Sequence, residues 1–203
     1  MNEWIFVVAA YLLGSVAFGI IVSKIFGLPD PRTVGSGNPG ATNVMRSGKK
    51  AAAILTLVGD AGKGWLMVWL TQHYGLAQEW VCAVAISVFF GHLYPVFYRF
   101  KGGKGVATAA GILIALWPWL GVSVMATWIL AFAMWRVSSL SALIAAGFAP
   151  IYAAAFFGFN LVTATVLVLS AMLVWRHKSN IRKLLLGTEP GFGKPKTGDM
   201  PPQ

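Results

Sequence analysis

The sequence predicts an all-α integral membrane protein with seven transmembrane helices, and three observations indicate this class. Of its 203 residues, 57% are hydrophobic and 11% are charged, whereas roughly a quarter of the residues of a soluble domain are charged. Apolar stretches recur along the chain at lengths close to the roughly 20 residues that a helix needs to cross a bilayer. Lys and Arg are concentrated in alternate connections, which is typical of a polytopic membrane protein.

The predicted spans follow one another with mostly short connections. In chain order they cover residues 4–25, 51–70, 80–98, 106–117, 119–135, 140–157 and 161–175. The first stretch, MNEWIFVVAAYLL, has no basic segment before its apolar run, so we interpret it as a retained span and not as a cleaved signal. The fourth span is short, and WPWLG at 117–121 is typical of a tight interfacial turn, because proline ends a helix and tryptophan prefers the headgroup level. Six spans are the alternative if the fourth segment is re-entrant.

The charge pattern predicts the orientation. Every Lys and Arg except Lys63 lies in or beside the first, third or fifth connection or in the C-terminal segment, and TQHYGLAQE, WPWLG and FGFN contain none. Basic loops face the cytoplasm, which places the N-terminus outside and the C-terminus in the cytoplasm. Ends on opposite sides require an odd number of crossings. We expect residues 1–189 to form one membrane domain with catalytic cytoplasmic loops, and 190–203 to form a disordered tail.

Several kinds of chemistry are poorly supported by the composition. The net charge is +10, which in a membrane protein indicates orientation rather than nucleic-acid binding. The single cysteine, Cys82, excludes an internal disulfide or a thiolate metal cluster. Carboxylates are scarce in the basic loops, so neither a Mg-nucleotide site nor a carboxylate pair is indicated, and no His is followed by Asp at the fifth position after it. We expect no metal and no cofactor.

The first basic loop, VGSGNPGATNVMRSGKK, has the composition of a phosphate cradle. Its glycines allow backbone N–H groups to face an anion, Ser36, Thr42 and Asn43 add donors, and Arg46 adds charge. The G-x-G-x-x-G string in it is not a dinucleotide fingerprint, because it follows a membrane helix instead of a strand. It also lacks the Lys of a P-loop. A flexible loop whose bases only set topology is the equally weighted alternative.

The third connection adds a second cluster, FKGGKGVATAAG, on the same side of the membrane. It leads to Thr108 at a predicted helix start, where free N–H groups and the helix dipole favour an anion. Upstream, GHLYPVFY places His92 inside the third span. A buried histidine needs a partner there, and we favour a structural role for it over a catalytic one.

A third polar cluster, RHKSNIRK, follows the last span. His177 and Asn180 are spaced to share one helix face, whereas we interpret Lys178, Arg182 and Lys183 as interfacial anchors. In the fifth connection, RVSSLSA contains Ser138 and Ser139, for which helix N-caps are the ordinary interpretation.

One pair of charges is predicted inside a span. Asp60 and Lys63 in VGDAGKGW are three residues apart on a helix and can pair. Each alone would cost about 2.5–3.5 kcal/mol at the bilayer centre. A functional role and a purely structural ion pair are equally compatible with the sequence.

Three segments in this order, GSGNPGATNV, GHLYPVFYRFKGGKGVAT and RHKSNIRKLLLGTE, resemble the cytoplasmic motifs of the PlsY family, and DAGKG and VSSL also match. These are bacterial acyl-phosphate-dependent glycerol-3-phosphate acyltransferases of the plasma (inner) membrane. The resemblance implies that acyl phosphate acylates the first hydroxyl of sn-glycerol 3-phosphate, giving lysophosphatidic acid and inorganic phosphate. It implies no direct use of acyl-CoA or acyl carrier protein. Membrane lipids are expected partners, and neither nucleic acid nor an obligatory protein partner is expected.

The resemblance also implies roles for individual residues. The residues expected to be catalytic are Ser36, Arg46, Lys104, Ser139, His177 and Asn180, and those expected to bind substrate phosphate are Gly35, Gly37, Asn38, Gly40, Thr42, Asn43, Gly102, Gly103 and Gly105. Ser36 and Arg46 would grip a phosphate, while Lys104 would stabilise charge on the acyl phosphate and on the departing phosphate. His177 and Asn180 would orient glycerol phosphate. The hydroxyl proton would pass to a substrate phosphate, with His177 as general base the rival route.

Two other classes of function are weaker matches. A transporter for an organic phosphate would place polar residues through the full membrane thickness and on both faces, whereas here they gather on one face. A membrane anchor for a cytoplasmic partner would need a larger exposed domain than the short PGFGKPKTGDMPPQ tail.

Overall fold

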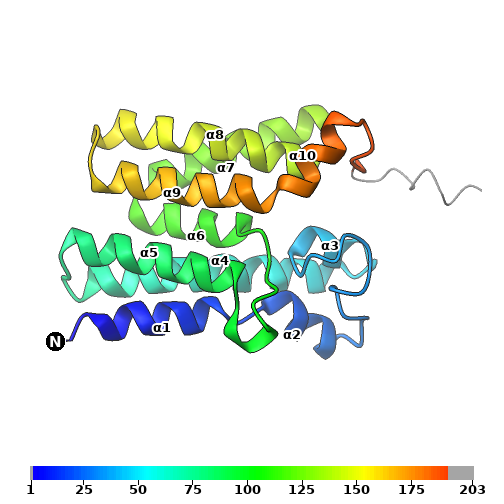
Figure 1. Ribbon diagram of the computed structural model, residues 1–203, viewed down its shortest axis with the longest axis horizontal. Helices are drawn as coiled ribbons and strands as arrows, with labels where there is room; N and C mark the ends of the chain where they lie inside the picture. Colours follow the sequence, from blue (N-terminus) through cyan, green and yellow to red (C-terminus); the bar gives the residue numbers. More distant parts are fainter. Residues whose placement is uncertain (1, 192–203) are drawn as a thin grey trace, which may run out of the picture.

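The computed structural model describes residues 2–191, and all regular structure in that range is helical. The elements are α1 (Trp4–Gly14), α2 (Phe18–Ile25), α3 (Ala41–Met45), α4 (Lys50–His73), α5 (Gln78–Leu93), the 3-10 turn η1 (Val96–Tyr98), α6 (Val106–Leu116), α7 (Pro118–Trp135), α8 (Ser138–Phe157), α9 (Leu161–Arg176) and α10 (Lys178–Leu185). The long helices lie side by side in one bundle (Figure 1). The predicted all-α class is confirmed for this range, and most of the predicted tail, 192–203, lies outside it.

Several of these helices are long and apolar enough to cross a membrane. Within residues 2–191, α4, α5 with η1, α7 and α8 each qualify alone, and α1 with α2 and α9 with α10 qualify as bent pairs. This gives four to six spans by length and composition. The predicted fourth span, residues 106–117, corresponds to α6, whose 11 residues rise only about 16 Å, roughly half the hydrocarbon thickness. The chain is a multi-pass membrane protein, and the count of seven stays a prediction.

The first predicted span is not a continuous helix, which corrects the expectation for residues 4–25. The chain bends by 44° between α1 and α2, and Ala17 at the break has an extended backbone. The Ser15 hydroxyl donates to the Tyr11 carbonyl and accepts from the Val96 amide. The Val16 carbonyl accepts instead from Lys63 Nζ of α4, at 2.7 Å. Lys63 thus satisfies a backbone carbonyl that the break frees.

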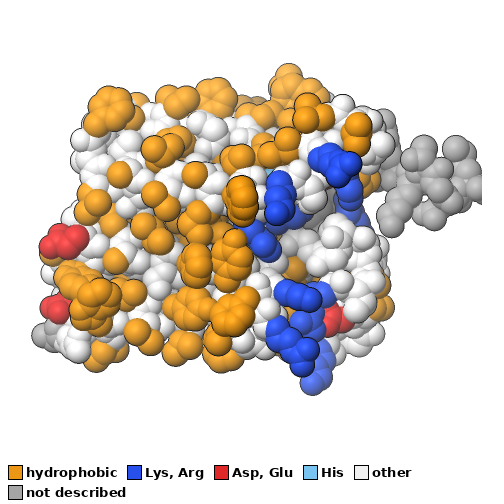
Figure 2. All heavy atoms as spheres, in the orientation of Figure 1, with side chains coloured by type: hydrophobic (Ala, Val, Ile, Leu, Met, Phe, Trp, Pro, Cys, Tyr) orange, Lys and Arg blue, Asp and Glu red, His pale blue; other side chains and the backbone are white. Residues whose placement is uncertain are grey.

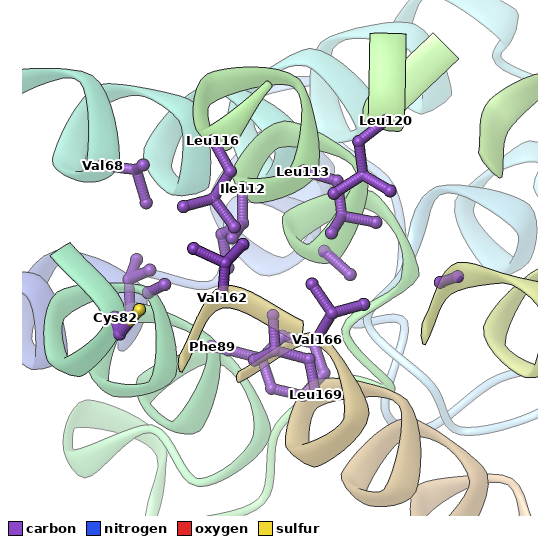
Figure 3. Close-up of a cluster of buried hydrophobic side chains, with 14 of the residues drawn as sticks. Val68, Cys82, Phe89, Ile112, Leu113, Leu116, Leu120, Val162, Val166 and Leu169 are labelled. Carbon is purple, nitrogen blue, oxygen red and sulfur yellow. The ribbon is translucent and has the colours of Figure 1, made fainter. Parts of the chain in front are cut away.

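The core lies where α4, α5, α6, α7 and α9 meet. Figure 3 shows the side chains that fill it, among them Val68, Cys82, Phe89, Ile112, Leu113, Leu116, Leu120, Val162, Val166 and Leu169. Ile112 of α6 is fully buried, so the short sixth helix packs inside the bundle. The burial of α6 explains why it is uniformly apolar although it is short.

The visible surface of the bundle is mostly apolar between its two ends (Figure 2). Large hydrophobic side chains such as Trp4, Leu130 and Met134 are more than 60% exposed, as expected for side chains that face lipid. Figure 2 shows hydrophobic side chains over most of the visible face, with Lys and Arg gathered toward the end that carries α2, α3 and α10. The predicted concentration of bases on one side of the molecule is therefore present.

Candidate active site

The loop between α2 and α3 is held in shape by Asn43. This side chain is buried, its Oδ1 accepts from the Ser36 amide at 2.9 Å, and its Nδ2 donates to the carbonyls of Pro31 and Val34. Gly35 and Gly37 beside it have positive φ angles of 60° and 70°, which L-residues rarely adopt. Asn43 thus braces the predicted phosphate cradle from within, and its amide is occupied by the loop itself.

Lys104 lies in the glycine-rich segment that leads into α6. Its Nζ donates to Asn180 Oδ1 of α10 at 2.6 Å. Burial lowers the pKa of Lys104 to about 8, and the nearby charges of Lys183, Arg46 and Arg176 act in the same direction against the carboxylate of Glu189. The pKa of the Lys104 ammonium therefore lies close to neutral pH, and the group sits at the basic end of the bundle.

Arg176, the last residue of α9, fixes the same glycine segment from the other side. Its Nε donates to the Gly103 carbonyl at 3.2 Å and its Nη2 to the Gly102 carbonyl at 3.0 Å. The guanidinium also lies over the ring of Tyr94, 5.3 Å from its centroid. Because Arg176 bonds to the Gly102 and Gly103 carbonyls, it connects the backbone next to Lys104 to the end of α9.

A carboxylate that is absent from the predicted site joins α8 to α10. Glu189 Oε1 accepts from Ser139 Oγ and from Asn180 Nδ2, each at 2.6 Å, while its Oε2 is buried and has no hydrogen-bond partner among residues 2–191. Its position at the end of the third basic motif is the signal that could have identified it. Neither Ser138 nor Ser139 is the N-cap of α8, which corrects that interpretation, because Val137 occupies the N-cap position and both serines lie within the helix.

His177 lies at the junction of α9 and α10. It is 2% exposed, and its Nδ1 lies 2.8 Å from the Leu173 carbonyl. Burial lowers the pKa of His177 to about 4, although the hydrogen bond to Leu173 opposes this. A neutral imidazole bonded in this way carries its proton on Nδ1, and this leaves Nε2 as an acceptor.

These segments enclose a cavity of about 250 Å³. The residues that line it are Ser36, Gly37, Asn38, Gly102, Lys104, Trp175, Arg176, Lys178 and Ser179. Five of the predicted site residues are among them. Arg46, Ser139, His177 and Asn180 lie outside the lining, although Asn180 contacts Lys104 directly. The remaining predicted residues, Gly35, Gly40, Thr42, Asn43, Gly103 and Gly105, also lie outside the lining.

Sequence reasoning missed the part of the lining that comes from α9 and α10. Lys178 was interpreted as an interfacial anchor, yet it lines the cavity and its Nζ lies over the Trp175 ring. Ser179 contributes a hydroxyl group. The hydroxyls of Thr42 and Ser138 are 3.2 Å apart and tie the first loop to α8. Within residues 2–191, no group of three or more His, Cys, Asp or Glu could hold a metal.

The arrangement can hold phosphate groups beside a membrane. Lys104, Arg176 and Lys178 supply positive charge, and hydroxyls and loop amides supply donors. Ionised donors of this kind form the strongest hydrogen bonds to phosphate oxygens. An anion that enters the cavity would lie next to an apolar protein surface.

Comparisons with known proteins indicate one family. A family model described as glycerol-3-phosphate acyltransferase matches residues 4–187. The glycerol-3-phosphate acyltransferase of Methylobacillus flagellatus is 64% identical over 194 residues, which cover 96% of this chain and 99% of the relative. That of Ralstonia nicotianae is 56% identical over 196 residues, which cover 95% of each chain.

Two solved structures also match. The crystal structure of PlsY (YgiH), an integral membrane glycerol 3-phosphate acyltransferase, in its glycerol 3-phosphate form has a TM-score of 0.90 and 36% identity, and the match covers 95% of this chain and 96% of that chain. The lysophosphatidic acid form has a TM-score of 0.88 and 34% identity over the same shares of the two chains.

Proposed function

The chain belongs to the glycerol-3-phosphate acyltransferase (PlsY) family, and from this premise we propose that it transfers a fatty acyl group from acyl phosphate to the first hydroxyl of sn-glycerol 3-phosphate. The protein is an acyltransferase of the membrane, and glycerol 3-phosphate is its acceptor. The proposed products are lysophosphatidic acid and inorganic phosphate. The reaction is then the first acylation step of phospholipid synthesis.

The cavity at the basic end of the bundle is the observation that best supports this reaction. It joins the Ser36 loop, the Lys104 segment and the start of α10, three segments that are far apart in the chain. Acyl phosphate and glycerol 3-phosphate both carry a phosphate group, and the lining offers three cationic side chains to them. The apolar exterior allows the acyl chain to remain in the bilayer while its phosphate enters the cavity.

The proposed reaction proceeds by acyl transfer with a phosphate leaving group. The first hydroxyl oxygen of glycerol 3-phosphate attacks the acyl carbonyl carbon and forms the new ester C–O bond. The bond between that carbon and the phosphate oxygen then breaks, and inorganic phosphate departs with the electron pair. Lys104, with the N–H groups of residues 102, 104 and 105, stabilises the negative charge on the departing phosphate, whereas the Gly103 N–H donates to the His92 carbonyl. A good leaving group makes a strong protein base unnecessary.

The proton of the attacking hydroxyl passes to a phosphate oxygen of the substrate in this proposal. His177 is the rival base, but the low pKa of its buried imidazole makes it a weak proton acceptor. The bond from its Nδ1 to Leu173 fixes the ring. We therefore assign His177 to the orientation of glycerol 3-phosphate.

The other predicted residues divide by their contacts. Ser36 and the loop amides bind a phosphate directly, with Arg46 adding charge from the end of α3. Asn180 holds the Lys104 ammonium, and Ser139 holds Asn180 through Glu189. Among the proposed phosphate-binding residues, Asn43 acts by bracing the Ser36 amide.

The placement of the enzyme in its membrane is part of the proposal. We place it in the bacterial plasma membrane with seven spans, the N-terminus outside and the cavity facing the cytoplasm. Residues 1–189 form the single catalytic membrane domain. This orientation is supported by the basic residues gathered at the cavity end of the bundle (Figure 2).

A donor comparison tests the proposed function. The purified enzyme in detergent with added lipid is given labelled glycerol 3-phosphate and either an acyl phosphate or the acyl-CoA thioester of the same chain length. We expect lysophosphatidic acid and an equal amount of inorganic phosphate with acyl phosphate only. Product formed from the thioester, with none from acyl phosphate, would contradict the proposed donor.

A further inference from the structure

A buried cluster of charged and polar groups lies within the membrane bundle, close to the cavity but not in its lining. Asp60 and Lys63 of α4 and His92 of α5 are between 2% and 7% exposed. Asp60 Oδ1 lies 2.9 Å from Lys63 Nζ and 3.5 Å from His92 Nδ1. Asp60 Oδ1 is buried and has no hydrogen-bond partner among residues 2–191, and Lys63 Nζ lies within ion-pair distance of it. The predicted ion pair is present, and His92 is its third member.

Lys63 also connects the cluster to the first helix pair. Its Nζ donates to the Val16 carbonyl at the break between α1 and α2. A charged side chain inside a membrane is costly unless it pairs, and such groups are rare outside functional positions. A pair that served only to join α4 to α1 would not need His92 as a third member.

His92 connects the cluster to the segment that carries Lys104. The His92 carbonyl accepts from the Gly103 amide at 3.1 Å. The imidazole lies so close to Gly103 that a Cβ at this position would overlap Nε2, and a Cβ at Gly102 would overlap the His92 carbonyl oxygen. Gly103 is bonded directly to Lys104. Any shift of the imidazole therefore moves the backbone that carries the Lys104 ammonium.

We propose that Asp60, Lys63 and His92 form a positioning cluster that sets the location of the glycine segment 102–105 and so holds Lys104 at the cavity. The cluster supports this segment from inside the bundle, and Arg176 holds its carbonyls from the end of α9. Asp60 anchors the His92 ring, and Lys63 neutralises Asp60. This inference rests on the proposed role of Lys104 in stabilising the departing phosphate.

Three variants test the cluster, so that the test does not depend on any single variant folding correctly. Asp60→Asn combined with Lys63→Met removes both charges together, so no buried charge is left uncompensated. His92→Gln keeps a polar side chain but removes the imidazole. Gly103→Ala places a methyl group against the imidazole from the loop side. The matched control is Gly62→Ala on the same helix α4, because nothing lies within 4 Å of the added Cβ there.

Measuring kcat and KM on correctly folded variants distinguishes a loss of Lys104 positioning from a loss of folding. For each variant that elutes and melts like the native enzyme, we expect kcat to fall at least about tenfold while KM for glycerol 3-phosphate changes less than about threefold, because Lys104 acts on the departing group. Gly62→Ala should retain native kcat. Gly103→Ala lies in a loop and does not depend on the buried charges, so it decides the question if the membrane variants misfold.

The outcomes distinguish this inference from the proposed function. Lys104→Ala is measured in parallel with the cluster variants. If Lys104→Ala is inactive while Gly103→Ala, or a folded cluster variant, has native kcat, the positioning cluster is wrong and the proposed function stands. If Lys104→Ala keeps native kcat, the proposed role of Lys104 is wrong and the inference falls with it. Loss of kcat in Lys104→Ala, in Gly103→Ala and in the folded cluster variants supports both.

Discussion

At the scale of the residue, the ionisation of Lys104 links the structure to a measurable pH profile. Burial lowers the pKa of Lys104 to about 8, so the ammonium is present below that pH and is lost as the pH rises through it. The charged form is the one that stabilises a departing phosphate. We therefore expect kcat/KM, which reports the free enzyme, to fall above about pH 8.

Lys104→Arg gives the matched measurement for this pH profile. Arginine stays charged across the accessible range, with a pKa above about 12. The variant should retain part of its activity and lose the alkaline fall in kcat/KM. An unchanged alkaline limb in Lys104→Arg would assign that limb to a different group.

His177 provides a second test at this scale, because its two proposed roles predict different losses. If it only orients glycerol 3-phosphate, His177→Gln should reduce kcat by no more than about tenfold, since an amide can replace the ring as a polar group. A general base would contribute about 10²–10⁴-fold. A fall in kcat of four decades at unchanged KM would favour the histidine base over proton transfer to substrate.

At the scale of the element, the loop between α2 and α3 depends on one buried side chain. Asn43→Ala removes three hydrogen bonds that hold this loop. We expect KM for glycerol 3-phosphate to rise at least about fivefold, because loss of a buried polar partner costs about 1–3 kcal/mol and 1.4 kcal/mol corresponds to about tenfold. Kinetics with limited proteolysis would show the loosened loop. Asn160→Ala, which removes the N-cap of α9, is the control, and its KM should stay native.

The sequence predicted the helices better than their ends and breaks. Long apolar runs identify α4, α5, α7 and α8 because hydrophobicity is a local property. The break after Gly14 depends on Lys63, which is distant in sequence and supplies the bond to Val16. The five-residue helix α3 is too short to give a periodic signal. These features depend on long-range contacts that no local pattern records.

The site was predicted in the same uneven way. Ser36 and Lys104 lie in conspicuous glycine-rich motifs, and both line the cavity. Arg176 resembles an ordinary anchor at the end of a helix, and only the fold shows that it bonds to the glycine segment. Glu189 is a single carboxylate near the chain end, and its contacts with Ser139 and Asn180 cross between helices.

At the scale of the whole molecule, the bends and contacts bring four segments to one end of the bundle. The Thr42–Ser138 contact and the Lys104–Asn180 bond show that the first loop, the glycine segment, the start of α8 and α10 converge. Because the glycine segment before α6 and the start of α8 after α7 both lie at this end, α6 must run away from it and α7 must run back to it. It supports the proposed seven spans, with α6 as the short outward member.

Labelling of a single cysteine at the turn between α6 and α7 tests this topology. Trp119 is 65% exposed, so Trp119→Cys should react with a membrane-impermeant maleimide from outside intact cells. Phe159→Cys at the α8–α9 turn is the positive control, Lys101→Cys at the basic end is the negative control, and the native Cys82 is buried. A Trp119→Cys protein that reacts only after the membrane is dissolved would indicate a re-entrant α6.

The central claim is that the cationic side chains lining the cavity at the basic end, Lys104 above all, promote acyl transfer from acyl phosphate. The most direct measurement compares kcat of Lys104→Ala with that of Lys101→Ala, using acyl phosphate and glycerol 3-phosphate. Both variants remove one lysine from the same segment, but only Lys104 lines the cavity, whereas Lys101 is exposed. We predict a fall of at least about 10²-fold in kcat for Lys104→Ala and native kcat for Lys101→Ala. Equal activity in the two variants, with both correctly folded, would contradict the account.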